Sequence, residues 1–220
     1  EIKTEGHADL VKALTFEFRT RIISELLGLP REDLDLFRRL SLDLISIPTD
    51  IMAGLTAATE LHGYFLNQVE QRRRKPTNDI IGDLCTAEID GEKLTDEAII
   101  AFLRLLLPAG LETTYRSSGN LLYLLLTHPE QLAMVRQDRS LIPLAIEEGL
   151  RMETPLTMVM RTTTEDIEMG GKSIPAGAQV DMCMGSANRD ETRWANAESF
   201  DILRPRQAHI AFAGGIHMCL

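Results

Sequence analysis

One long helical pattern in the middle of the chain constrains the fold more than any other feature. Apolar residues recur at helical spacing over residues 95–126, and acidic residues stand in the first turn, where they suit the helix dipole. Pro108 interrupts this run. It removes a backbone donor and pushes on the carbonyl of Arg104, so we expect a kink within one helix. The polar sequence Glu112-Thr113-Thr114 just past the kink is unusual for a helix of this length.

The rest of the chain predicts a mainly α protein with a small β part. The spacing of apolar residues changes from helix-like to strand-like after Pro155, and glycine-rich turns separate the strands. From Asn188 onward the chain is irregular and rich in polar residues. The expected helices cover residues 9–27, 31–45, 57–74, 78–86, 129–136 and 141–152, and the expected strands cover residues 159–164, 167–169 and 179–182.

Composition limits the class of protein and its partners. Hydrophobic residues make up 44% of the 220 residues, which favours one globular domain over disorder. A net charge of −10 argues against nucleic acid as the main partner. The longest nearly apolar run, residues 98–107, contains a charge and is too short to cross a bilayer, so we expect no membrane span. The run Arg72–Lys75 is interpreted as a solvated helix end, with a docking patch for a redox partner as the alternative.

Cysteine usage indicates a reducing compartment. Cys85, Cys183 and Cys219 form neither a CxxC motif nor an even disulfide framework. No charged-then-apolar leader stands near Glu1, so we expect no secretion signal. We therefore expect a cytoplasmic protein.

The last residues of the chain carry the strongest indication of chemistry. Gly214 and Gly215 precede His217 and Cys219, and glycines let the backbone approach a flat ligand closely. Backbone N–H groups in such a loop can point at a thiolate and tune it. Two alternatives remain from the residues alone: a structural cysteine that packs as a small hydrophobe, or a zinc ligand without an obvious second pair.

Two further groups of residues become informative only together with that loop. Glu148 and Arg151 are three apart on a helix and can pair; such a pair is usually solvated, and it changes meaning if it is buried. A threonine within the long helix, Thr113, can bond the carbonyl one turn back, and Glu112 beside it can relay protons. The alternative is a helix that simply tolerates two threonines.

Along the chain, the long interrupted helix comes first, the helix with Glu148 and Arg151 second, and the glycine loop with Cys219 last. Three groups in this order resemble the cytochrome P-450 family, specifically its soluble bacterial kind. The resemblance covers nearly the whole chain and implies a cytochrome P-450 fold truncated at both ends. Residues 1–155 are then mostly helical, 156–183 form a small β region, and 184–220 form the meander and the Cys loop. Ala213 departs from the glycine usual in the family. The matching residues are Phe212, Gly215, His217 and Cys219; Ala109, Gly110, Glu112 and Thr113; Glu148 and Arg151; Arg161 after Met158-Val159-Met160; and Phe200–Arg204.

The resemblance implies a role for each matching residue. Cys219 would bind the iron of haem b (iron protoporphyrin IX). His217 and Arg161 would bind haem propionates, Phe212 would shield the thiolate, and Ala109 and Gly110 would leave room for dioxygen. Glu112 and Thr113 would deliver protons, and Glu148, Arg151 and Arg204 would form a buried network beneath the Cys loop. The expected substrate wall consists of Leu105, Ala109, Thr113, Met158, Val159 and Met160.

The implied activity is haem-dependent monooxygenation, in which O2 is activated and an apolar organic substrate is hydroxylated. Electrons would come from a separate ferredoxin or flavin reductase, because the chain has no Gly-rich dinucleotide motif. Two alternatives are a haem-thiolate enzyme that uses peroxide, and an inactive helical fragment without haem.

Overall fold

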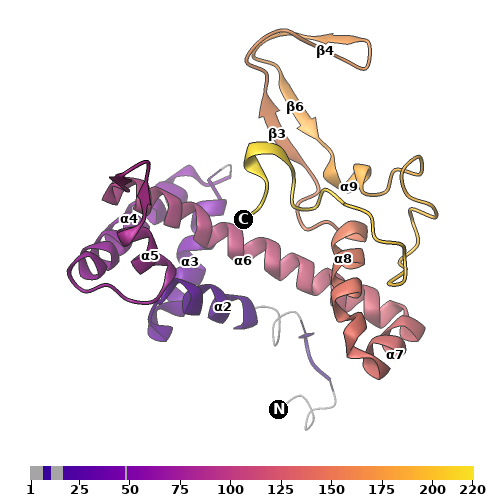
Figure 1. Ribbon diagram of the computed structural model, residues 1–220, viewed down its shortest axis with the longest axis horizontal. Coiled ribbons are helices and arrows are strands. Elements are labelled where there is room, and N and C mark those ends of the chain that lie inside the picture. The colour runs from indigo at the N-terminus through magenta and orange to yellow at the C-terminus, as the bar shows by residue number, and fades with distance from the viewer. Residues whose placement is uncertain (1–6, 11–16, 48) are drawn as a thin grey trace. The chain divides into compact units, whose positions relative to one another are not determined.

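The computed structural model describes residues 7–10, 17–47 and 49–220. The chain divides into two compact units, Glu1–Tyr115 and Arg116–Leu220, which we call the first and the second unit and describe separately (Figure 1). The structure is mostly helical, and the strands among the described residues lie at 88–93 and 159–182, so the expected mainly α class is confirmed.

The first unit is a helical body around one apolar core. The most deeply buried side chains include Leu27, Phe37, Leu61, Phe65 and Leu103, which come from four different helices. Its helices are α2 (Glu17–Leu27), α3 (Leu34–Ile45), α4 (Ile51–Arg74), α5 (Ile80–Thr86) and the amino-terminal part of α6 (Asp96–Thr127), with a 3₁₀ turn, η2 (Arg31–Asp33), before α3.

Helix boundaries in this unit follow the capping residues. Gly28, with φ +68°, ends α2 as expected; the first part of the helix expected over residues 9–27 lies partly outside the described residues. Helix α4 begins at Ile51, six residues before the expected start at residue 57, because Asp50 accepts from the backbone N–H of Ala53 at 3.0 Å.

A small hairpin lies between α5 and α6. Strands β1 (Glu88–Ile89) and β2 (Glu92–Lys93) pair antiparallel around Asp90 and Gly91. Both turn residues have positive φ, +55° and +83°, as a two-residue hairpin turn with the right twist requires. Strands of two residues are too short to leave a period in the sequence.

The basic end of α4 is bonded to neighbouring elements through Arg72 and Arg73. Arg72 is buried and donates to Asp79 Oδ1 at 3.0 Å, to Gln68 Oε1 at 2.6 Å and to the carbonyl of Gly28 at 2.8 Å. Arg73 donates to Asp96 Oδ1 at 3.0 Å. The prediction of a solvated helix end is therefore wrong for Arg72 and Arg73, because each finds partners on other elements that the local pattern does not reveal.

Helix α6 is a single α-helix through Pro108, as expected, and the kink remains a prediction. By length and composition it could also cross a membrane, unlike the ten-residue run considered from the sequence. However, it carries Arg104, Glu112 and Arg116 within its length, and its Leu103–Leu111 segment contributes to the core of the first unit. We interpret it as the core helix of a folded domain.

The second unit combines helices, two short sheets and an irregular segment. Its helices are confirmed within one residue of expectation, whereas β5 and α9 were not expected because they are too short to show a period. The elements are the carboxyl-terminal part of α6, α7 (Pro129–Gln137), η3 (Arg139–Leu141), α8 (Ile142–Met152), α9 (Met184–Ala187) and η4 (Gly215–His217), with the antiparallel pairs β3 (Val159–Thr162)–β6 (Gln179–Met182) and β4 (Ile167–Met169)–β5 (Lys172–Ile174).

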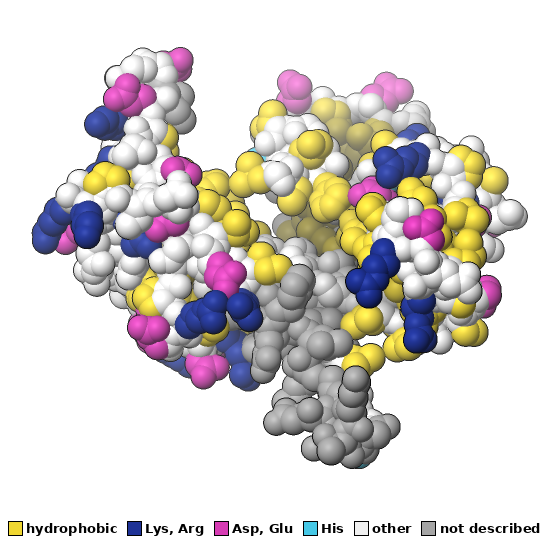
Figure 2. All heavy atoms as spheres, turned by 60° about the horizontal axis from the view of Figure 1, so that its bottom comes forward, with side chains coloured by type: hydrophobic (Ala, Val, Ile, Leu, Met, Phe, Trp, Pro, Cys, Tyr) yellow, Lys and Arg dark blue, Asp and Glu magenta, His cyan; other side chains and the backbone are white. Residues whose placement is uncertain are grey.

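Apolar side chains also reach the surface in both units (Figure 2). In the first unit, Ile51, Met52 and Leu55 are exposed at the start of α4, and in the second unit Ile216 and Met218 are exposed in the Cys loop. Contiguous apolar surface of this kind marks places where a protein contacts a ligand or another surface.

Candidate active site

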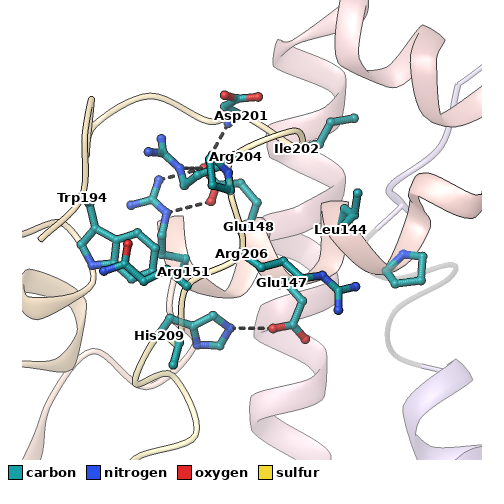
Figure 3. Close-up of a pocket in the computed structure, with 14 residues that line it drawn as sticks. Leu144, Glu147, Glu148, Arg151, Trp194, Asp201, Ile202, Arg204, Arg206 and His209 are labelled. Carbon is teal, nitrogen blue, oxygen red and sulfur yellow. Dashed lines mark hydrogen bonds and ion pairs between the residues drawn. The ribbon is translucent and has the colours of Figure 1, made fainter.

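A carboxylate and two guanidinium groups form a buried network in the second unit (Figure 3). Both carboxylate oxygens of Glu148 accept from Arg151, one from Nε and one from Nη2, each at 2.8 Å. Nε of Arg204 and the backbone N–H of Asp201 both donate to Oε1 of Glu148 at 3.0 Å. Glu148 is 5% exposed and Arg151 is 1% exposed. The pair is thus not the solvated pair that its spacing alone suggests.

The same arginines hold the irregular segment after α9. The indole ring of Trp194 lies against Arg151, with the ring centroid 5.3 Å from Cζ. An arginine offers five donors, so it can satisfy backbone carbonyls where no regular secondary structure does. The carbonyl acceptors are those of Asn188, Ala197 and Ser199 for Arg151, and of Ala195, Asn196 and Ser199 for Arg204.

A cavity of about 430 Å³ lies beside this network, between α8 and residues 201–209 (Figure 3). His209 on its wall is largely buried, and its Nδ1 accepts from the backbone N–H of Ala211 at 3.2 Å. Its Nε2 faces Oε2 of Glu147 at 3.2 Å. His209 also lies beside Phe212, with ring centroids 5.7 Å apart. It thereby connects α8 with the start of the Cys loop.

The Cys loop, residues 212–219, is closed by backbone hydrogen bonds. The N–H of Cys219 donates to the carbonyl of Phe212 at 3.0 Å, and the N–H of Met218 donates to the carbonyl of Gly215 at 3.1 Å. Ala213 and Gly215 both have positive φ, +57° and +70°. The hydrogen bond between Cys219 and Phe212 therefore holds the last residue of the loop against its first residue.

The outer face of the loop is open and apolar. A side chain built at Gly214 or Gly215 would meet no atom within 4 Å. Ile216 is 96% exposed, and Met218 is 63% exposed. Cys219 is exposed and its thiol is free, so the interpretation as a buried structural cysteine is wrong. A free thiol among apolar side chains on a face without obstructing Cβ atoms fits a flat, apolar, metal-bearing group such as haem.

A zinc site finds no support in the part of the chain that the structure describes. Within those residues, no three His, Cys, Asp or Glu side chains gather closely enough to hold a metal ion. A haem iron needs only one protein ligand on this side, so a solitary thiolate is compatible with it.

The acid–hydroxyl step of α6 belongs to the first unit. Oγ1 of Thr113 donates to the carbonyl of Ala109 at 2.8 Å, as expected for a threonine within a helix. Leu105, Ala109 and Thr113 are spaced by four residues and therefore lie on one face of α6, whereas the core-facing Leu103, Leu107 and Leu111 lie on another.

Gly110 has a different environment from the one expected. A Cβ at this position would lie 3.1 Å from Cδ1 of Ile23, which comes from α2. The missing side chain thus admits a core residue of the neighbouring helix. The contact with Ile23 indicates a packing role for Gly110, and the room that Ala109 and Gly110 would leave for dioxygen remains a proposal.

The register of β3 with β6 divides the expected substrate wall. Val159 pairs with Met182 and Arg161 pairs with Val180, so these four share one face of the sheet. Met160 pairs with Asp181 and points to the opposite face. The sheet face that carries Arg161 therefore includes Val159, Val180 and Met182 but not Met160.

Two residues of this site were not found from the sequence. Asn188 is 1% exposed and bonds both to α8 and to the segment before the Cys loop, and His209 links Glu147 with Phe212. Each acts through partners more than twenty residues away or through ring contacts, and neither stands in a periodic pattern. An asparagine in a polar, irregular stretch gives no indication of being buried.

The second unit thus contains a buried network of Glu148, Arg151 and Arg204 and, further along the chain, a loop with glycines and an exposed thiol. A model of the family described as Cytochrome P-450 matches residues 16–220, and the chain belongs to this family. Membership implies a haem cofactor.

Relatives and solved structures agree with this assignment. The chain is 37% identical to the Vitamin D(3) 25-hydroxylase of Pseudonocardia autotrophica over 100% of its own length and 55% of the relative. It matches the structure of the Bacillus subtilis bacillaene polyketide synthase cytochrome P-450 PksS with a TM-score of 0.93 and 33% identity, covering 99% of this chain and 57% of that one. It matches CYP109E1 of Bacillus megaterium in complex with testosterone with a TM-score of 0.90 and 35% identity, covering 99% and 61%. The chain thus spans little more than half the length of these proteins.

Proposed function

We propose that the whole protein to which this chain belongs is a haem-dependent monooxygenase with Cys219 as the axial ligand of haem b. The observation that carries the proposal is the free, exposed thiol of Cys219 at the end of a loop whose N–H groups and glycines leave one open apolar face. Family membership supports the class of activity.

The residues of the loop and of β3 would hold the cofactor. Cys219 would bind the iron as a thiolate, and His217 and Arg161 would bind the propionates, for which a permanently charged guanidinium is well suited. Phe212 would cover the sulfur and keep water from it. When bound, the thiolate-ligated haem supplies the electron density that favours cleavage of the O–O bond.

Residues of α6 would supply the protons that the reaction consumes. The hydroxyl of Thr113 is held by the carbonyl of Ala109, so its oxygen is fixed in position and can accept a proton from a neighbouring donor. Glu112, the preceding residue, would supply that proton from solvent. Ala109 would keep the adjacent space open because its side chain is small.

We propose a bulky apolar substrate. The helix face with Leu105, Ala109 and Thr113 and the sheet residue Val159 would form its wall, and these side chains are mainly apolar. One relative is named for hydroxylation of vitamin D3 and a structural neighbour was solved with testosterone, both large and apolar. The protein would act in the cytoplasm with a ferredoxin or flavin reductase as electron donor.

The test is the carbon monoxide difference spectrum of the reduced whole protein, with and without Cys219→Ala. The wild type should show the red-shifted Soret band of a thiolate-ligated haem, and the variant should lose it. Cys183→Ala, which removes an exposed cysteine outside the loop, is the matched control and should keep it. A thiolate band that survives Cys219→Ala would refute the proposal.

The electron source separates the proposal from a peroxide-using enzyme. Product formation from a steroid or secosteroid with a ferredoxin system and NAD(P)H supports monooxygenation. Product that forms with hydrogen peroxide alone, and not with the reductase system, would assign the protein to the peroxide-using kind.

A further inference from the structure

One buried amide joins the Glu148–Arg151 network to the segment that leads into the Cys loop. Asn188 is 1% exposed, and its backbone carbonyl accepts from Nη1 of Arg151 at 2.8 Å. Its side-chain Oδ1 accepts from the backbone N–H of Ile210 at 2.8 Å. Arg151 and Ile210 are thus bonded to the same residue from opposite sides.

The contact at Ile210 continues to the cysteine through the backbone. The carbonyl of Ile210 accepts from the N–H of Ala213 at 2.9 Å, and the carbonyl of Phe212 accepts from the N–H of Cys219 at 3.0 Å. The peptide between Phe212 and Ala213 takes its direction from the φ of Ala213, which is +57°. The position of Ile210 therefore determines where the Phe212 carbonyl points, and that carbonyl fixes the backbone of Cys219.

The second arm of the Asn188 side chain fixes its orientation. Nδ2 donates to Oγ1 of Thr154 at 2.8 Å, and that hydroxyl in turn donates to the carbonyl of Leu150 at 3.0 Å. Because the Thr154 proton is already used, its oxygen offers only lone pairs to Asn188. An amide can accept from an N–H at Oδ1 and donate to a lone pair at Nδ2 at the same time, which an ionised carboxylate cannot do.

We propose that Asn188 is a positioning residue for the Cys219 thiolate, acting through Ile210, Ala213 and Phe212. The inference rests on the proposed function for its consequence at the haem, but the anchoring itself concerns only this chain. A buried hydrogen bond to the loop's leading segment limits the positions the sulfur can adopt, and the coupling to Arg151 explains how a network at α8 acts on a loop nearly seventy residues further along.

Hydrogen exchange in the haem-free whole protein tests the anchoring directly. Asn188→Ala should speed exchange of the Ala213 and Cys219 amides by about tenfold, since a single buried hydrogen bond corresponds to an effect of that order. Gln131→Ala is the matched control: Gln131 also bridges two backbone groups, the carbonyl of Phe200 at 2.6 Å and the N–H of Ile202 at 2.9 Å, but not toward the Cys loop. Equal exchange at Cys219 in the two variants would overturn the proposal.

The haem-bound protein supplies a second readout. Asn188→Ala should shift carbon monoxide spectra from the thiolate-ligated band toward the band of a protonated or displaced thiol, while Thr154→Val, which removes the partner of Nδ2 but keeps the bond to Ile210, should shift them less. Asn188→Asp retains an acceptor for the N–H of Ile210 and should keep the thiolate-ligated band. Loss of the band in Asn188→Asp under conditions where its far-ultraviolet circular dichroism is native would count against the proposal, and so would an unchanged band in Asn188→Ala.

Different results would refute Cys219 as the haem ligand and Asn188 as the positioning residue. If Cys219→Ala keeps the thiolate band, the proposed ligand is wrong, whereas amide exchange still decides whether Asn188 anchors the loop. If Cys219→Ala removes the band and Asn188→Ala changes neither the band nor the exchange, the ligand stands and the positioning role of Asn188 is refuted.

Discussion

The carboxylate of Glu148 accepts from two guanidinium groups and a backbone N–H while it is almost completely excluded from water. Such a group is costly to leave without its partners, because the remaining charges stay buried. Glu148→Ala should therefore lower the free energy of unfolding by about 4 kcal/mol. Urea unfolding of the whole protein, followed by circular dichroism, measures this loss.

The control for that substitution is an exposed ion pair in the same unit. Glu198 pairs with Arg189 at 3.2 Å, and its side chain is largely exposed. Glu198→Ala should cost less than about 1 kcal/mol, since exposed pairs contribute little. Similar losses for the two variants would show that the Glu148 network does not stabilise the fold in the way its geometry indicates.

Ala213 carries backbone strain that a glycine would relieve. Its φ of +57° lies in the left-handed region, where a side chain costs about 1–2 kcal/mol. Ala213→Gly should therefore raise the free energy of unfolding, by about 1 kcal/mol after allowance for the greater entropy of glycine in the unfolded chain. Ala208→Gly, at an exposed loop position without positive φ, should have the opposite sign. A loss of stability in Ala213→Gly would contradict this account of the loop.

At the scale of elements, the bond between Arg72 of α4 and Asp79 at the start of α5 makes the free energy of unfolding depend on pH. Burial raises the pKa of Asp79, but hydrogen bonds from Arg72, the hydroxyl of Thr77 and the N–H of Gly82 outweigh it, so that the pKa is lowered from its usual value. A lowered pKa in the folded state contributes stability above the unfolded pKa, near 4, and that contribution is lost as pH falls through the folded pKa.

Asp79→Asn should consequently flatten the acid side of the stability curve. Asparagine also caps helices well, so the start of α5 should persist while the titration disappears. The free energy of unfolding of the wild type should fall more steeply between about pH 5 and pH 2 than that of the variant. Arg72→Met should move the wild-type curve toward that of Asp79→Asn. Parallel curves for wild type and Asp79→Asn would exclude Asp79 as a source of the acid sensitivity.

The elements also show what local sequence can predict. Long helices were recognised because apolar spacing and stop signals such as Gly28 act within a few residues. Strands β1, β2 and β5 and the early start of α4 were missed, because short strands leave little period and the start of α4 depends on one capping side chain. The basic run at the end of α4 was misinterpreted because its partner Asp79 and the carbonyl of Gly28 are contributed by other elements. Contacts of this kind are decided by tertiary structure.

The candidate site, like the fold, could be predicted from the sequence only in part. Motif residues such as Cys219, Glu148 and Thr113 were recognised by their types and their order along the chain. The sequence did not reveal that Gly110 makes room for Ile23, nor that Met160 and Arg161 point to opposite faces of a sheet, because packing and register determine these facts. Asn188 was missed because its importance lies only in what it connects.

At the scale of the whole molecule, the chain spans 55–61% of the length of the relative and the two solved structures compared with it. The Cys loop presents its thiol on an open face with Ile216 and Met218 largely exposed. A haem held only by this face would leave much of its apolar surface in water, which costs roughly 25 cal/mol for each Å².

We therefore expect the isolated 220-residue chain to bind haem weakly and below one equivalent, whereas the whole protein binds it stoichiometrically. Titration with haemin, followed by the Soret absorbance of the reduced carbon monoxide complex, measures both. Cys219→Ala in the isolated chain separates specific ligation from adsorption: residual binding that survives this change is adsorption onto exposed apolar surface. Tight one-to-one uptake with a thiolate band in the isolated chain would mean that α6, β3 and the Cys loop suffice to build the cofactor site.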